Sequence, residues 1–179
     1  ALDLDHTLLG EDSTISARNK EAVARALELG IKVMICTGRM FRSSLPFAKE
    51  LKLTGPLICY NGGLVKEIES GRELFHQPLD LDLAAEILAL AKKEGIHANL
   101  YYQDQLYYER WTEEAEYYTT QAKVPGKAVG DLLAFLPGAP TKILFVMEPA
   151  KVQQLWESLR EHYAGKLNVT VRLSHSCCT

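Results

Sequence analysis

Two carboxylates and a hydroxyl follow the first apolar residues of the chain, in the run Ala1-Leu2-Asp3-Leu4-Asp5-His6-Thr7. Alternate side chains of a β-strand share a face, so Asp3 and Asp5 start on one side, and a turn after them can bring both to one ion or phosphate. One carboxylate can attack phosphorus when a divalent cation screens the repulsion, and another can protonate the leaving oxygen. Acids at a strand end are often only solvated, so this interpretation depends on their partners.

Two further polar segments each follow an apolar run. Thr37-Gly38-Arg39 comes after residues 31–36, and Asn61-Gly62-Gly63 comes after residues 57–60. Nearly unbroken apolar runs are typical of strands covered on both faces, as in parallel sheets. Right-handed crossovers would place the three strands in one parallel sheet, with their polar ends along the edge where ligands bind in open α/β sheets.

Helices must connect these strands. Apolar residues recur at helical spacing after Ser16, a natural N-cap, and the pattern stops at Gly30. A second helix is expected to begin near Ser43 or Ser44, with Pro46 in its first turn. The order β-α-β-α-β predicts the α/β class, with a Rossmann-like parallel-sheet core.

The pattern changes after residue 63. Hairpins are predicted within residues 64–76 and 97–110, helices at 82–94, 113–121 and 150–163, and strands at 142–147 and 169–173. Hairpins mixed with helices predict an inserted α+β domain that carries its own antiparallel sheet. The predicted division is residues 1–78 for the N-terminal part of the core, 79–173 for the insertion, and 174–179 for the start of the return to the core.

Composition narrows the choice of partner. The 179 residues are 47% hydrophobic and 24% charged, with a net charge of −3, so there is no electrostatic case for nucleic acid or an anionic membrane surface. No apolar stretch is long enough to span a bilayer, and the spacing of the four cysteines favours reduced thiols. These features predict a cytoplasmic protein that binds a small molecule, and they leave its oligomeric state open.

The three polar segments, taken in order, resemble the haloacid dehalogenase superfamily, and within it the Cof-type phosphatases. The resemblance rests on residues 3–9, on Thr37-Gly38-Arg39, on Tyr60-Asn61-Gly62-Gly63, and on the insertion, which is similar to that family's large cap domain. It covers essentially the whole chain. It implies a phosphatase that uses Mg²⁺ and acts on small phosphorylated metabolites such as sugar phosphates or nucleotides.

The resemblance also implies roles for individual residues. Asp3 would be the catalytic nucleophile and a metal ligand, and Asp5 would be the general acid and base while its backbone carbonyl binds the metal. Thr37 and Gly38 would bind the phosphate group. Arg39, Asn61 and Gly62 would border the phosphate or the rest of the substrate.

The sequence departs from the family pattern in two places. His6 stands where the family usually has glycine; it is either a proton donor or substrate contact beside Asp5, or a tolerated loop substitution, and the second interpretation is favoured. The family's later lysine and paired-acid motif are not identifiable before Thr179. We therefore expect both ends to be truncated, the 179 residues alone to be weakly active or inactive, and the parallel sheet to expose an apolar edge.

Three functions remain open at this stage. The leading one is phosphate monoester hydrolysis through an aspartyl-phosphate on Asp3. A phosphosugar mutase of the same superfamily would keep the fold but move the phosphate between positions on a sugar. A non-catalytic binding module is the third, because the distal lysine and acids are missing.

The aromatic residues of the inserted domain have two interpretations. Tyr101, Tyr102, Tyr107, Tyr108 and Trp111 could line a substrate pocket or pack within the sheet. Adjacent tyrosines on a strand point to opposite faces, so at most half of each pair can face the core site. Structural roles are favoured.

Overall fold

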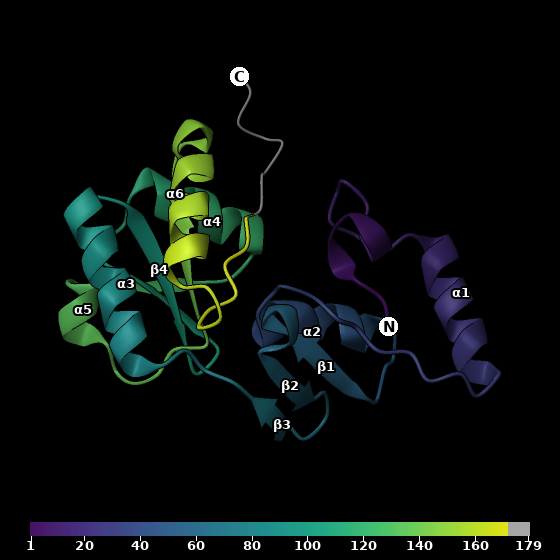
Figure 1. The fold of residues 1–179 in the computed structure, drawn as a ribbon. Coiled ribbons are helices and arrows are strands. Elements are labelled where there is room, and N and C mark those ends of the chain that lie inside the picture. Colours follow the sequence, from purple (N-terminus) through teal and green to yellow (C-terminus); the bar gives the residue numbers. More distant parts are fainter. Residues whose placement is uncertain (172–179) are drawn as a thin grey trace.

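The computed structural model describes residues 1–171, which form two parts built around separate β-sheets (Figure 1). One sheet has the strand order β1-β2-β3, and the other has the order β6-β5-β4-β7. The connection between β3 (Glu73–His76) and α3 (Leu81–Glu94) leads from the first part to the second. The observed fold is therefore of the expected α/β class, with a separate second sheet.

The remaining elements follow in chain order within each type. The helices are α1 (Ala17–Glu28), α2 (Phe41–Glu50), α4 (Glu113–Ala122), α5 (Leu132–Phe135) and α6 (Pro149–His162), and η1 (Leu4–Leu8) and η2 (Tyr60–Gly62) are short, irregular helical turns. The strands are β1 (Pro56–Cys59), β2 (Leu64–Glu67), β4 (His97–Tyr102), β5 (Gln105–Tyr108), β6 (Gly126–Ala128) and β7 (Lys142–Val146). Within residues 1–171, no helix is both long and apolar enough to cross a lipid bilayer.

Three chain segments run parallel in the first part, as the sequence predicts. Leu2 pairs in parallel with Ile35, and Cys36 pairs in parallel with Ile58 of β1. The predicted strands at the chain start and at residues 31–36 are reduced to these isolated bridges, whereas β1 is a full strand that continues antiparallel into β2 and β3. The parallel pairing is short, but it places the ends of all three segments at one edge of the sheet.

Helix α1 begins and ends as predicted. The Ser16 hydroxyl accepts a hydrogen bond from the Asn19 backbone N–H at 3.1 Å, and Gly30 adopts a left-handed backbone with φ +77°. Both are standard ways of closing helix ends.

Helix α2 begins at Phe41, so the predicted start near Ser43 or Ser44 is wrong, and Pro46 lies inside the helix instead of in its first turn. The Met40 N-cap makes no side-chain capping bond. The first amides of α2 are bound instead by the carboxylate of Asp104, which lies in the second part of the chain. The residues around Phe41 cannot predict a capping residue that lies so far along the chain.

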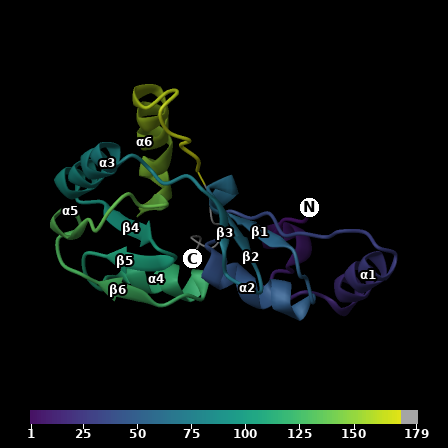
Figure 2. The same cartoon turned by 90° about the horizontal axis from the view of Figure 1, so that it is seen from below.

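The second sheet is covered by helices on both faces (Figure 2). Residues of α3 and α5 pack with Ala98 and Leu100 of β4 in one hydrophobic cluster, whereas Tyr101 on the opposite face packs with Ala115 of α4. The pairs β4–β5 and β4–β7 are antiparallel as expected. Strand β6 was not predicted, and it pairs in parallel with β5, so the sheet is not purely antiparallel. The short helix α5 was not predicted either.

The predicted strand at residues 169–173 is wrong for its described portion, because residues 169–171 form no strand. Residues 172–173, and the predicted return to the core at 174–179, lie outside the described residues. So do Cys177 and Cys178. The other two cysteines, Cys36 and Cys59, are free thiols, and burial raises the pKa of Cys59 to about 12.

The aromatic residues of the second sheet support its packing. Tyr101 and Tyr108 are buried, and the rings of Tyr101 and Tyr60 meet edge to face with centroids 5.8 Å apart. Trp111 is exposed. The buried rings agree with the structural role favoured from the sequence.

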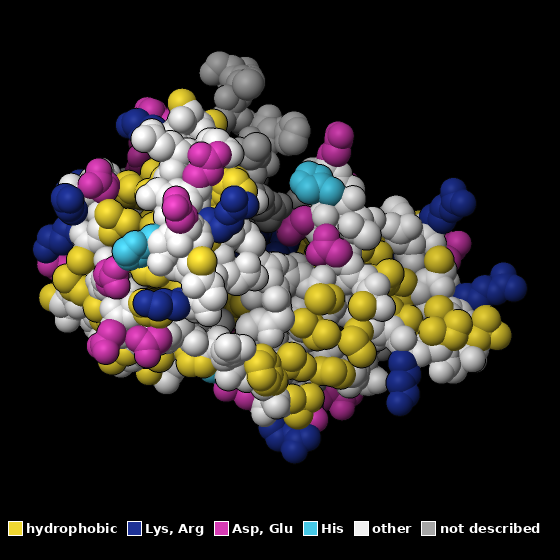
Figure 3. All heavy atoms as spheres, in the orientation of Figure 1, with side chains coloured by type: hydrophobic (Ala, Val, Ile, Leu, Met, Phe, Trp, Pro, Cys, Tyr) yellow, Lys and Arg dark blue, Asp and Glu magenta, His cyan; other side chains and the backbone are white. Residues whose placement is uncertain are grey.

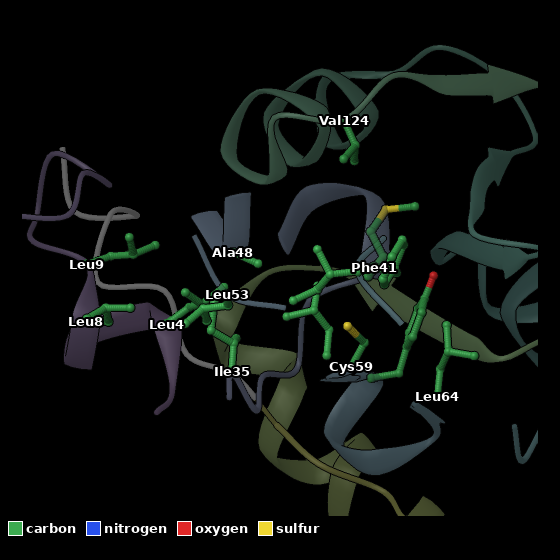
Figure 4. Packing of buried hydrophobic residues seen from close by; sticks show 14 of the residues in the cluster. Leu4, Leu8, Leu9, Ile35, Phe41, Ala48, Leu53, Cys59, Leu64 and Val124 are labelled. Atoms are coloured by element: carbon green, nitrogen blue, oxygen red, sulfur yellow. The ribbon is translucent and has the colours of Figure 1, made fainter. Parts of the chain in front are cut away.

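One hydrophobic cluster joins the two parts. It contains Leu4 and Ile35 beneath the strand ends, Phe41 at the start of α2, and Tyr101 and Val124 from the second part. Figure 4 shows Val124 pointing from the second part toward the residues of the first. The packing of the two parts is therefore continuous through this cluster.

Apolar side chains are also exposed on the first part. Figure 3 shows hydrophobic side chains gathered over β1, β2 and β3. Leu74 and Phe75 of β3 are about half exposed, and Leu29 and Ile31 after α1 are more exposed still.

Replacing Leu100 by alanine tests the core of the second sheet. Leu100 is 0% exposed, so Leu100→Ala should lower the free energy of unfolding by about 2–5 kcal/mol through lost burial and a residual cavity. Leu81→Ala makes the same chemical change at a residue that is 46% exposed and should cost less than about 1 kcal/mol. Urea unfolding of both variants measures the difference, and equal costs would contradict the described packing.

Candidate active site

The parallel bridges bring the three predicted polar segments together. Tyr60 donates its backbone N–H to the Arg39 carbonyl at 3.0 Å, and Asn61 donates its backbone N–H to the Thr37 carbonyl at 3.1 Å. These two bonds join the second polar segment to the third. The first segment is joined to the second through side chains.

That side-chain connection is an ion pair between Asp5 and Arg39. The Arg39 Nη2 atom lies 2.6 Å from Asp5 Oδ1, and Arg39 Nε lies 3.1 Å from Asp5 Oδ2. The side chains of Asp5 and Arg39 are only 20% and 12% exposed. Two bonds in this fork geometry, partly shielded from water, hold the carboxylate much more firmly than a surface pair would. The sequence predicts Arg39 beside the substrate and does not predict this pair.

Asp3 is in a different environment from Asp5. It is exposed, and its Oδ2 atom accepts a weak hydrogen bond from the Thr7 hydroxyl at 3.4 Å. Between the two carboxylates and Thr7, His6 adopts a left-handed backbone with φ +58°, which forms the tight turn expected at this position. The exposed Asp3 carboxylate is the one available to an incoming ligand, and Asp5 is held by a cation.

Thr37 lies deeper than the other site residues. It is 3% exposed, and its Oγ1 atom accepts a hydrogen bond from the Arg39 backbone N–H at 3.2 Å. The bond fixes the oxygen and leaves the hydroxyl proton to be donated.

Gly38 and Asn61 are in close contact. A Cβ atom added at Gly38 would lie 2.7 Å from Asn61 Oδ1, closer than such atoms approach. Tyr60, Asn61 and Gly62 all have positive φ, at +53°, +56° and +98°. The Asn-Gly pair therefore supplies the left-handed turn that the sequence indicated, and glycine at 38 leaves room for the asparagine side chain.

The structure places the three predicted segments side by side, and it gives contacts to Tyr60 and Asp104, to which the sequence assigned no role. Tyr60 holds the Arg39 carbonyl, and its hydroxyl donates to Asp104 Oδ1 at 3.0 Å. Burial raises the pKa of Tyr60, so its hydroxyl remains a proton donor. The only sequence signal for Asp104 is its place in a hairpin turn, which does not say what the carboxylate contacts.

The donor set fits a magnesium ion to a limited extent. Among residues 1–171, no group of three or more His, Cys, Asp or Glu side chains is placed to hold a metal. Mg²⁺ is often bound by only one or two carboxylates, with waters and substrate phosphate oxygens completing its shell. The exposed Asp3 carboxylate suits that mode. Arg39 contacts both carboxylate oxygens of Asp5.

Comparison with known proteins gives one matching family model, described as haloacid dehalogenase-like hydrolase, over residues 1–177. The pyridoxal phosphate phosphatase YbhA of Escherichia coli is 35% identical over 112 residues, which cover 63% of this chain and 41% of that protein. The 5-amino-6-(5-phospho-D-ribitylamino)uracil phosphatase YitU of Bacillus subtilis is 35% identical over 100 residues, or 54% of this chain and 36% of that protein.

Solved structures show the same fold. A haloacid dehalogenase-like hydrolase from Bacteroides thetaiotaomicron matches with a TM-score of 0.85 and 25% identity, over 96% of this chain and 66% of that one. TM0651 from Thermotoga maritima matches with a TM-score of 0.77 and 29% identity, over 91% of this chain and 61% of that one. The chain thus spans about two fifths of the two curated relatives and less than two thirds of these two structures.

The contact between Gly38 and Asn61 can be tested by a double-mutant cycle. Gly38→Ala should cost about 0.5–1.5 kcal/mol of stability, because the new methyl group forces the Asn61 side chain out of its rotamer. In an Asn61→Gly background, which keeps the left-handed backbone, the same change should cost clearly less. Urea unfolding of the four proteins measures the coupling. The same cost in both backgrounds would show that the two residues are not in contact.

Proposed function

The chain belongs to the haloacid dehalogenase-like hydrolase family, and on that premise we propose that the full-length protein is a magnesium-dependent phosphatase of small phosphorylated metabolites. The observation that carries the proposal is the meeting of Asp3, Asp5, Thr37-Gly38-Arg39 and Asn61-Gly62 at one edge of the sheet. An exposed carboxylate, a fixed hydroxyl and a guanidinium at one place suit a phosphate monoester.

The first chemical step belongs to Asp3. Its carboxylate oxygen attacks phosphorus, the bond from phosphorus to the leaving oxygen breaks, and a proton from the Asp5 carboxyl goes to that oxygen. In the second step the Asp5 carboxylate takes a proton from water, and the water oxygen attacks the phosphorus of the aspartyl-phosphate. The bond from phosphorus to the Asp3 oxygen breaks, which releases inorganic phosphate and restores the Asp3 carboxylate. A magnesium ion held by Asp3 and the Asp5 carbonyl would screen the charge of the carboxylate and the phosphate.

The second and third polar segments would bind the phosphate oxygens. The Thr37 hydroxyl has a proton to donate, and the backbone N–H of Gly38 belongs to the same loop. Arg39 supplies positive charge next to Asp5, and Asn61 and Gly62 border the site from the third segment. Donors fixed before the substrate arrives favour the transition state, because they need no rearrangement during the reaction.

The ion pair of Asp5 sets a condition on this mechanism. The guanidinium of Arg39 contacts both carboxylate oxygens of Asp5, so it must move before Asp5 can give a proton to the leaving oxygen. The acid role in the first step requires Asp5 to carry a proton. We therefore propose that an arriving phosphate group draws Arg39 toward itself and lets Asp5 take up that proton.

The two parts of the fold would have different roles in the reaction. In the proposed division, residues 1–78 form the N-terminal part of the catalytic core, residues 79–173 form a cap that reads the substrate beyond its phosphate, and residues 174–179 begin the return to the core. The names of the relatives YbhA and YitU refer to small phosphate esters. A small phosphorylated metabolite is therefore the proposed partner, without nucleic acid or membrane, and the cytoplasm is the proposed location.

Replacing the nucleophile tests the chemistry. Asp3→Asn in the full-length protein keeps the side-chain shape and removes the attacking charge, so release of phosphate from an aryl phosphate should fall by on the order of 10³-fold or more. Asp82→Asn, a matched change at an exposed residue of α3, should leave the rate within about twofold of the unchanged protein. Retained turnover in Asp3→Asn would overturn the assignment.

Metal dependence is a separate test. Treatment of the full-length protein with a chelator should abolish phosphate release from a panel of sugar phosphates, nucleotides and pyridoxal phosphate, and added Mg²⁺ should restore it. Colorimetric phosphate measurement gives the result. Equal rates with and without Mg²⁺ would contradict a metal role, and an isomerised sugar phosphate without free phosphate would indicate a mutase.

A further inference from the structure

Asp104 connects the second sheet to the first residues of α2. Its Oδ1 atom accepts hydrogen bonds from the Phe41 backbone N–H and the Tyr60 hydroxyl, both at 3.0 Å. Its Oδ2 atom accepts from the Arg42 backbone N–H at 2.8 Å. One side chain of the second sheet therefore binds two helix amides and a phenol of the first part.

These contacts supply a helix cap that α2 does not have in its own sequence. The N-cap residue of α2, Met40, has no side-chain oxygen with which to bind the first-turn amides. A carboxylate at this point satisfies two N–H groups and interacts favourably with the positive end of the helix dipole. The capped turn directly follows Thr37-Gly38-Arg39.

The backbone that presents Asp104 is strained. Strands β4 and β5 are joined through a two-residue loop, Gln103 and Asp104, whose φ angles are +49° and +55°. Such turns normally carry asparagine and glycine, and other residues in the left-handed region cost on the order of 1 kcal/mol each. Strain of this kind persists where surrounding contacts determine the conformation, and here those contacts are the bonds of Asp104.

The hydrogen bonds of Asp104 connect it to Arg39 indirectly, by two routes. Along the chain, the capped residues Phe41 and Arg42 stand two and three positions after it. Across the fold, Tyr60 gives its hydroxyl to Asp104 and its backbone N–H to the Arg39 carbonyl. Next to Asp104, Gln105 Oε1 accepts a bond from Arg42 Nη1 at 3.3 Å.

We propose that Asp104 is a positioning residue of the second sheet, which fixes the Thr37-Gly38-Arg39 loop and thereby sets the affinity of the site for phosphate. The assignment rests on the proposed function for the identity of the ligand. Asp104 touches neither the phosphate nor the reacting atoms and acts through Phe41, Arg42 and Tyr60. Through Asp104, the second part of the chain, which would recognise the substrate beyond its phosphate, also determines how tightly the Thr37-Gly38-Arg39 loop binds phosphate.

The test is the affinity of the full-length protein for inorganic phosphate with Mg²⁺, measured by isothermal titration calorimetry. Asp104→Asn keeps the shape of the side chain but turns an N–H₂ group toward the Phe41 or Arg42 amide, so phosphate binding should weaken about tenfold. Asp104→Glu, which restores the charge, should recover part of the affinity. In steady-state assays the loss should appear mainly in KM, with kcat less affected.

Asp80→Asn is the matched control. Asp80 is the N-cap of α3, and its Oδ1 atom accepts from the backbone N–H groups of Asp82 and Leu83 at 3.0 and 3.1 Å. Asp80→Asn keeps the accepting Oδ1 atom and should change the melting temperature little, and only Asp104→Asn should weaken phosphate binding. Unchanged binding in Asp104→Asn, or an equal loss in both variants, would overturn the positioning role.

A second comparison shows whether Asp104 acts through the loop. In an Arg39→Lys background, Asp104→Asn should cause much less further loss of phosphate affinity, because the two residues act as one unit. A full tenfold loss of phosphate affinity in that background would show that Asp104 does not act through Arg39. The outcome is separate from the proposed function, which fails on retained turnover in Asp3→Asn whatever the effect of Asp104.

Discussion

The site depends on a few backbone hydrogen bonds between three short parallel segments. Leu2 donates to Met34 and accepts from Cys36, while Ile58 donates to Ile35 and accepts from Thr37, all at 2.9–3.0 Å. The carboxyl ends of parallel strands lie at one edge, so this pairing brings residues far apart in the sequence to the same place. The buried side chains beneath it keep the segments in register.

Two carboxylates of the same chemical type, those of Asp3 and Asp5, have different environments in this arrangement. Asp3 is exposed and has one weak hydrogen bond, whereas Asp5 is partly shielded and is held by Arg39 from the next segment. A free carboxylate is suited to attack, and a paired carboxylate is suited to proton transfer once its partner moves. The proposed assignment of nucleophile and acid therefore follows from environment as well as from order in the sequence.

Local signals in the sequence predicted much of this fold, and the errors have a common cause. Ser16 and Gly30 mark the ends of α1, and the polar strand ends identify the site, because each signal lies within the element that it defines. The start of α2 depends on Asp104, and the short β6 depends on pairing with β5. Neither feature can therefore be predicted from the residues next to it in the sequence. The Asp5–Arg39 pair was likewise missed because it joins two segments across the sheet edge.

The proposed mechanism requires Asp3 to accept the phosphoryl group. The most direct measurement is to quench the full-length protein in acid during turnover of a phosphate ester with Mg²⁺, and to map the phosphorylated residue by mass spectrometry. We expect one phosphoryl group on the peptide that contains Asp3, and none when Asp3 is asparagine. A phosphoryl group on another residue, or turnover with no phosphorylated enzyme at any quench time, would contradict it.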